Sequence, residues 1–146
     1  MEDRNSVYRE FIGNLMSKNL TDSPYYPIEY FEKKYRRYLK WGFLLPPSCK
    51  RAWWVNRFWE WSRVIKTRGI SQEECIFLLI KKNTQYSSKP LLLVGLSGIT
   101  IRSMSKLIRI QNMGGQDSDA ESIKDNLMDL YNYSILALLL LEEKLI

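Results

Sequence analysis

The chain has 146 residues, 45% of them hydrophobic, and a formal charge of +6, which is the size of one domain with enough apolar material for a core. It has no histidine and only two cysteines, which excludes a Ser-His-Asp or Cys-His catalytic group and argues against a structural zinc site. Any bound metal would be a hard cation on oxygen ligands, with Mg²⁺ the expected cofactor.

The predicted elements are helices almost throughout. Helical spacing of apolar residues predicts helices at residues 6–19, 28–41, 50–66, 75–82 and 98–112, and a last helix that ends near residue 144. Gly42 and Gly69 are expected to end the second and third helices. Ser71 and Glu74 have the spacing of a capping box before the fourth. Residues 83–95 are expected to form a loop, with residues 90–94 as one candidate short strand.

The last helix is expected at the centre of the fold. Ser118 or Ser122 can cap its N-terminus. Residues 136–141 are apolar all round the helix, which is typical of a segment buried inside the domain or against a second copy. We therefore predict an all-α protein, a single compact domain of five or six helices spanning residues 1–146, built around a C-terminal helix hairpin.

Two charged faces on the last two helices are the candidate functional site. The acidic face holds Asp125, Asp129 and Asn132 at i, i+4 and i+7, and the basic face holds Arg102, Lys106 and Arg109 at the same spacing. Paired carboxylates can hold a divalent cation, and arginines suit phosphates. On spacing alone we favour the structural interpretation, in which the two faces pair and close a helix hairpin. Both can hold together, because Mg²⁺ and a triphosphate can insert between such helices.

The positive charge is concentrated in the first half, where residues 1–70 hold 14 basic and 7 acidic residues. Residues 33–41 alternate aromatic and basic residues, which suits single-stranded nucleic acid. An amphipathic helix that buries its tyrosines has the same pattern. We favour that interpretation, because no RNA-binding signature accompanies the stretch. The tryptophans of residues 53–61 are expected in the core.

Residues 81–144 resemble a known family. The segments KNTQYS, GITIRSMSKLIRIQNM and ESIKDNLMDLYNYSILALLLLEE have the order and spacing of small phage-borne nucleotide modification associated domains, relatives of the MazG-like all-α NTP pyrophosphatases. The matching residues are Lys82, Asn83, Tyr86, Arg102, Lys106, Arg109, Glu121, Ser122, Ile123, Asp125, Leu127, Asp129, Leu130, Asn132, Tyr133 and Ser134. The chain departs from the pattern at Gln85, Ser87, Ser105 and Lys124, which removes three acidic residues.

The resemblance implies a phage-encoded protein that binds a nucleotide, or a small molecule derived from one, between the basic and acidic helices. In such domains carboxylates hold Mg²⁺ against the phosphates, and attack by water releases pyrophosphate. With three acids replaced, we expect binding with weakened or lost hydrolysis. The resemblance assigns metal binding to Glu121, Asp125 and Asp129, and ligand binding to Lys82, Asn83, Tyr86, Arg102, Lys106, Arg109 and Asn132. It also implies a homo-oligomer and a role in nucleotide-pool control, DNA modification or capture of a host-defence signal.

The alternative function is a non-catalytic nucleic-acid-binding or protein-interaction module that uses the basic, aromatic first half. The chain opens on charged residues without the apolar segment of a signal peptide. The apolar run near the C-terminus is shorter than the roughly 20 residues that span a bilayer. We therefore expect a cytoplasmic protein without a membrane partner.

Overall fold

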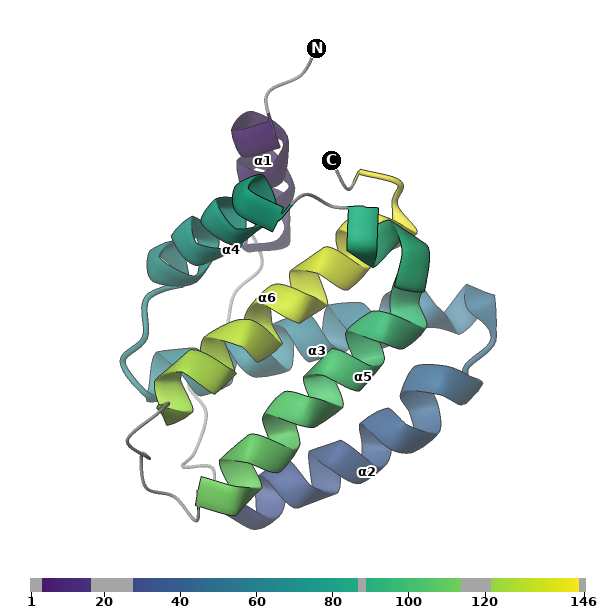
Figure 1. The fold of residues 1–146 in the computed structure, drawn as a ribbon, viewed down its shortest axis with the longest axis vertical. Coiled ribbons are helices and arrows are strands. Elements are labelled where there is room, and N and C mark those ends of the chain that lie inside the picture. The colour runs from purple at the N-terminus through teal and green to yellow at the C-terminus, as the bar shows by residue number, and fades with distance from the viewer. Residues whose placement is uncertain (1–3, 17–27, 87–88, 114–121, 145–146) are drawn as a thin grey trace.

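The computed structural model describes residues 4–16, 28–86, 89–113 and 122–144 and contains six helices (Figure 1). They are α1 Arg4–Met16, α2 Ile28–Leu44, α3 Pro47–Thr67, α4 Gln72–Tyr86, α5 Lys89–Met113 and α6 Ile123–Leu141. These described ranges hold no β-strand, so the prediction of an all-α fold is confirmed.

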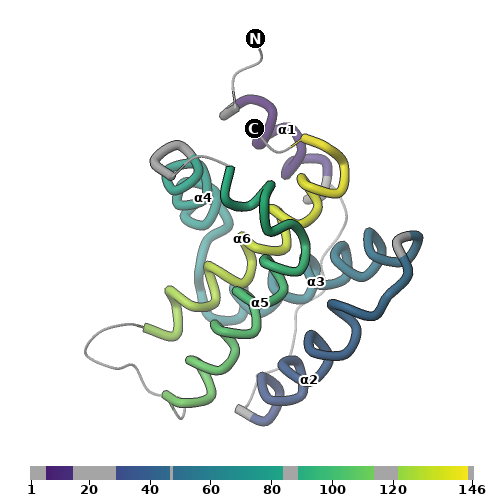
Figure 2. The backbone as a smooth tube through the Cα atoms, turned by 45° about the vertical axis from the view of Figure 1, so that its right-hand side comes forward, coloured from purple at the N-terminus to yellow at the C-terminus, as the bar shows by residue number. Residues whose placement is uncertain are grey.

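Helix α6 lies at the centre of the arrangement. It packs against α3 and α5, and α4 contacts it as well. Helix α2 runs antiparallel to α5 on the side of α5 away from α6, and α1 packs against α4 (Figures 1 and 2). The hairpin of α5 and α6 is therefore the centre of the fold, as predicted.

The sequence of α6 explains its central position, since it is apolar on nearly every face. Between Ile123 and Leu139, all residues except Lys124, Asp125 and Tyr133 are buried. Residues 136–139 are among the buried ones, so this apolar run lies inside the domain, one of the two predicted locations.

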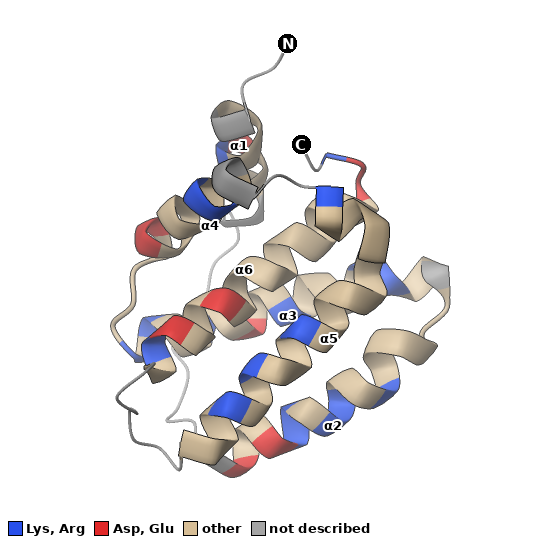
Figure 3. Ribbon diagram, viewed as in Figure 1, with Lys and Arg blue, Asp and Glu red and all other residues tan. Residues whose placement is uncertain are grey.

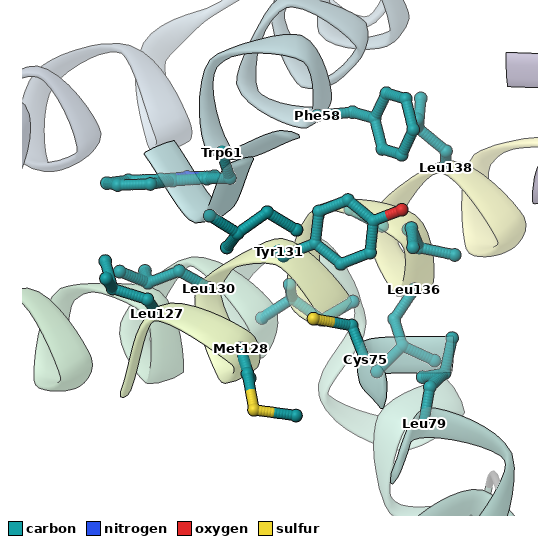
Figure 4. Close-up of a cluster of buried hydrophobic side chains, with 14 of the residues drawn as sticks. Phe58, Trp61, Cys75, Leu79, Leu127, Met128, Leu130, Tyr131, Leu136 and Leu138 are labelled. Atoms are coloured by element: carbon teal, nitrogen blue, oxygen red, sulfur yellow. The ribbon is translucent and has the colours of Figure 1, made fainter. Parts of the chain in front are cut away.

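Aromatic side chains of α3 form the side of the core that faces α6. A stripe of Trp54, Phe58, Trp61 and Ile65 at helical spacing is buried along its whole length, so the expectation of core tryptophans is confirmed for Trp54 and Trp61. The rings of Phe58 and Tyr131 lie with their centroids 5.4 Å apart, and Figure 4 shows both in the cluster that joins α3, α4 and α6. Such ring pairs stabilise a core by about 0.5–1.5 kcal/mol beyond the burial of their area.

A buried polar network joins α2 to α3. Lys34 forms an ion pair with Glu60, and both side chains are almost fully buried. Arg57 lies 3.5 Å from the same carboxylate and over the ring of Trp53. Burial lowers the pKa of Lys34, while its hydrogen bond to Glu60 acts in the opposite direction. The pair is therefore held in a poorly hydrated environment, where each charge depends on the other.

We predict that Tyr38→Phe lowers the free energy of unfolding by about 1–3 kcal/mol, because it leaves a buried N–H group without an acceptor. In the folded chain Trp61 Nε1 donates to the Tyr38 hydroxyl at 2.8 Å, and both side chains are fully buried. Denaturant unfolding followed by tryptophan fluorescence measures the effect. Tyr35→Phe, one turn earlier and half-buried, is the control, and an equal loss in both variants would contradict the prediction.

The helix ends match the capping signals in the sequence. The backbone N–H of Glu74 donates to Ser71 Oγ at 3.1 Å, and Glu74 Oε2 accepts from the Ser71 backbone N–H at 3.3 Å. Ser122 Oγ accepts from the backbone N–H of Asp125 at 3.0 Å, so Ser122 caps α6. The other candidate cap, Ser118, lies outside the described residues.

The predicted loop at residues 83–95 is wrong. Helix α4 continues to Tyr86 and α5 begins at Lys89, so residues 90–94 are helical and not a strand. Pro90 is tolerated because it is the second residue of the helix, where its missing N–H has no helical partner. Gly95 adopts φ 63° and ψ −157°, outside the helical region, so α5 consists of two helical segments joined by a kink at this residue.

Gly42 does not end α2, which runs on to Leu44. A Cβ atom at Gly42 would lie 2.6 Å from Thr100 Cγ2. The glycine therefore permits close packing of α2 against α5. Its role here is in packing and not in ending the helix.

Helix α5 is long and apolar enough to cross a membrane by length and composition, and little of that stretch is buried within the molecule. A single helix of this kind is weak evidence for a membrane span.

Candidate functional site

A cavity of about 280 Å³ lies between α4, α5 and α6. Its lining residues are Leu79, Lys82, Asn83, Pro90, Leu91, Arg102, Asp129, Asn132, Tyr133 and Leu136. Five of them were predicted as site residues from the sequence: Lys82, Asn83, Arg102, Asp129 and Asn132. The volume is near the lower end of the range of about 300–1,000 Å³ for small-molecule sites.

Asp129 is the electrostatic centre of the site. Its Oδ2 lies 2.9 Å from Lys106 Nζ, and its Oδ1 lies 3.2 Å from Lys82 Nζ. The predicted pairing of the acidic and basic faces is confirmed for Lys106. The contact with Lys82 was not predicted. Residue 82 was expected to be the last residue of its helix, so the direction of its side chain was unknown. Figure 3 shows acidic positions of α6 facing basic positions of α5.

The charges around the cavity give it an excess of positive charge. Lys82, Arg102 and Lys106 outnumber the single carboxylate of Asp129. The side chain of Lys82 is half exposed and Arg102 is exposed, whereas that of Lys106 is largely buried. Lys82 and Arg102 can therefore turn to an anion in the cavity while Lys106 stays with Asp129.

Asn132 lies in the wall of the cavity with only half of its amide satisfied. Its Nδ2 donates to the backbone carbonyl of Cys75 at 3.0 Å. A carbonyl can only accept, so this contact fixes which end of the amide is nitrogen. The buried Oδ1 has no hydrogen-bond partner among the described residues.

Asn83 has a structural contact in addition to its place in the cavity wall. Its Nδ2 donates to the Tyr8 hydroxyl at 2.8 Å, and both residues are buried. This bond ties α4 to α1, so a substitution at Asn83 changes the packing of α1 as well as the cavity.

The rest of the wall is apolar and was missed by the sequence analysis. Leu79, Leu91 and Leu136 give it a surface that suits a flat ring or other apolar group. Tyr133 completes it, and burial, followed by the negative charge of Asp129, raises the pKa of its hydroxyl. The hydroxyl is therefore protonated at neutral pH and can donate a hydrogen bond. Tyr133 lies within the motif quoted above, which was the available signal.

The other predicted site residues that the structure describes do not line the cavity, although the charge of Arg109 acts on the Tyr133 hydroxyl. Arg109 lines a separate groove on the side of α5 that faces α2. Asp125 is exposed in the first turn of α6. Glu121 and the side chain of Tyr86 lie outside the described residues.

The described carboxylates fit a resident Mg²⁺ ion poorly. Mg²⁺ requires near-octahedral oxygen coordination. The site offers Asp129, whose two oxygens each contact a lysine, and Asp125 one turn away. Within the parts of the chain that the structure describes, no three Asp, Glu or Cys side chains converge to form a metal site.

Lys124, which departs from the family pattern, has a structural partner. Its Nζ lies 3.1 Å from Glu74 Oε1. The hydrogen bond from Lys124, together with the capping contact to Ser71, lowers the pKa of Glu74. The cation at this position therefore joins the start of α6 to the start of α4.

The aromatic residues of α2 are mostly used in packing. Tyr38 is buried and Tyr35 is half-buried, while Trp41 is exposed beneath Lys40, whose Nζ lies 4.6 Å from the ring centroid. The preferred interpretation of this stretch, an amphipathic helix that buries its tyrosines, is confirmed for Tyr38.

No family model matches the chain, and neither the curated proteins nor the solved structures contain a significant match to it.

Proposed function

We propose that the chain binds a nucleotide, or a small molecule derived from a nucleotide, in the cavity between α4, α5 and α6. The observation that supports the proposal is that cationic side chains and an apolar wall meet in one cavity. A nucleotide has the matching parts, an anionic phosphate chain and a flat ring. The resemblance to the MazG-like relatives is part of the same proposal, as are a phage origin, a homo-oligomeric state and a cytoplasmic location.

In this proposal the phosphates contact Lys82 and Arg102, which form charge-assisted hydrogen bonds. Tyr133 donates its hydroxyl proton to a further ligand oxygen. The base or another apolar group lies against the leucine wall. Asp129 is a positioning residue, since it holds Lys106 and orients Lys82 when no ligand is present.

Release of pyrophosphate is the weaker part of the proposal. Mg²⁺ would supply charge neutralisation and orientation of the attacking water. Because the described donor set fits the ion poorly, we expect binding to persist in EDTA and turnover to be slow or absent.

Calorimetric titration with a panel of NTPs, dNTPs and dinucleotides, with EDTA or with Mg²⁺, tests binding. Phosphate release after addition of inorganic pyrophosphatase tests turnover with the same panel. Heat of binding in EDTA supports the proposal, and its absence for every compound contradicts it. Turnover in Mg²⁺ above the Asp129→Ala background would show that the hydrolytic part is correct.

We predict that Asp129→Asn tightens nucleotide binding about three- to ten-fold, since removal of one negative charge near the phosphates corresponds to about 1 kcal/mol. A metal-bridged complex predicts the opposite sign, because the substitution removes a ligand of the metal. Calorimetry in EDTA and in Mg²⁺ distinguishes the two. Asp125→Asn is the matched control on the same helix and should change affinity little.

A second candidate function is nucleic-acid binding by α2. It is favoured by the exposed cations Lys33, Arg36, Arg37 and Lys40, and it predicts binding that weakens steeply with salt. A gel shift at low salt tests it, and no retardation of single- or double-stranded DNA or RNA would reject it.

A further inference from the structure

Exposed apolar side chains are concentrated on α2 and α5. Of the ten large hydrophobic residues that are exposed in the described chain, nine lie on these two helices. They are Leu39, Trp41, Phe43 and Leu44 on α2, and Leu92, Leu93, Val94, Ile101 and Ile108 on α5. The tenth, Phe77, lies on α4. The two helices that carry these side chains pack against each other, and a concentration of exposed apolar side chains marks an interaction site.

A groove runs between the two helices within this surface. It is lined by Tyr35, Ile101, Met104, Ser105, Ile108 and Arg109 and has a volume of about 410 Å³. Ile101, Ser105 and Ile108 are at i, i+4 and i+7, so they form one stripe along α5. The small side chain of Ser105 between the two isoleucines leaves room for the ridge of an approaching helix.

The same two helices are strongly basic. Between Lys89 and Met113 α5 has no acidic residue. Of its cations, Arg109 lines the groove, whereas Arg102 lines the cavity and Lys106 pairs with Asp129. On α2, the four exposed cations Lys33, Arg36, Arg37 and Lys40 accompany Glu29 and Glu32, whereas Lys34 is buried against Glu60. Glu32 already pairs with Arg36 at 2.9 Å. Figure 3 shows the basic positions along both ribbons.

We propose that the α2/α5 groove, defined by the six lining residues above, binds an acidic amphipathic helix of another protein. A groove with an apolar stripe at helical spacing fits the apolar face of a helix, as in helix-in-groove recognition. The basic surroundings select a partner with Asp and Glu beside that face. A second copy of this chain is disfavoured, because it would bring two basic surfaces together. The surface is separate from the nucleotide cavity, so the two proposals fail independently.

The test uses the full chain and a fluorescein-labelled peptide of about 18 residues, with Leu at i, i+3, i+4 and i+7 and Glu at the flanking positions. A permuted peptide of the same composition, with its leucines spread around the helix, is the control ligand. We expect the first peptide to bind by fluorescence anisotropy, and the permuted peptide to bind at least about ten-fold more weakly. Binding should weaken as salt is raised.

The matched variants are Ile101→Glu and Phe77→Glu, whose parent side chains are 58% and 65% exposed, so both substitutions are compatible with folding. Ile101→Glu should weaken peptide binding about ten-fold or more and Phe77→Glu should not. Neither should change nucleotide affinity.

Three results would overturn the proposal. The first is equal binding of both peptides, or no binding of either. In the second, the chain binds anionic phospholipid vesicles or single-stranded DNA but not the peptide, and Ile101→Glu abolishes this binding. The third is dimerisation of the chain that Ile101→Glu abolishes, measured by light scattering.

Discussion

Replacing Glu60 by glutamine is expected to lower the free energy of unfolding by about 3–5 kcal/mol, because it leaves a buried ammonium without its counter-charge. The side chain of Lys34 is only 6% exposed in its pair with Glu60, and Arg57 adds a second cation beside the same carboxylate. Glutamine keeps the size and one oxygen acceptor but removes the charge. Guanidinium unfolding followed by tryptophan fluorescence measures the loss.

The control for this prediction is Glu32→Gln. Glu32 pairs with Arg36 one turn away on α2, but both side chains are more than half exposed. Exposed pairs of this kind contribute about 0–1 kcal/mol. If Glu60→Gln and Glu32→Gln lost equally little unfolding free energy, the stabilising role of the buried Lys34–Glu60 pair would be contradicted.

The loss of unfolding free energy in Glu60→Gln should also depend on pH. Burial lowers the pKa of Lys34 from its ordinary value of 10.5, so the unfolded chain holds this proton more tightly than the folded chain does. Stability from this group therefore rises as pH rises from the folded pKa towards 10.5. Without Glu60 the pKa of Lys34 falls further, so the variant should regain stability relative to the wild type as pH rises.

The double substitution Lys82→Ala/Arg102→Ala is expected to weaken nucleotide binding at least about 100-fold, since each charge-assisted hydrogen bond to phosphate contributes about 1.5–3 kcal/mol. The two residues are the accessible cations of the cavity, and loss of Lys82 also leaves Asp129 with less positive charge around it. Calorimetry with the tightest compound of the panel measures the change.

Lys81→Ala is the matched control for the double variant. Lys81 is an exposed neighbour of Lys82 on α4 and does not line the cavity. An equal loss of nucleotide affinity in the control and in the double variant would indicate long-range charge attraction and not contact in the cavity. Thermal unfolding of each variant checks that the fold is intact.

Most of the helical segments were predictable because the spacing of apolar residues is a local property of the sequence. The stripe from Trp54 to Ile65 and the capping pattern of Ser71 with Glu74 both predicted what the fold contains. The segment at residues 83–95 was mispredicted because Pro90 and Gly95 are ordinary loop signals. In the fold, Pro90 is a tolerated first-turn proline and Gly95 forms a kink within α5, and the buried side chain of Leu91 lies between them.

The candidate site was predictable only in part for a similar reason. Spacing assigns Arg102, Lys106 and Arg109 to one face of an isolated helix, but it does not say which neighbour each side chain meets. Lys106 meets Asp129, whereas Arg109 borders the α2/α5 groove. The leucines of the cavity wall have no sequence signal that separates them from core leucines, since both kinds occupy apolar positions.

We propose above that the cavity between α4, α5 and α6 holds a phosphate-bearing ligand. The most direct test of this proposal is a ¹H–¹⁵N NMR titration of the full chain with the nucleotide panel in EDTA. The account predicts saturable shifts at the backbone amides of cavity residues on all three helices, including Lys82, Arg102 and Tyr133. No shifts at saturating nucleotide, or shifts confined to the outer face of α2, would contradict it.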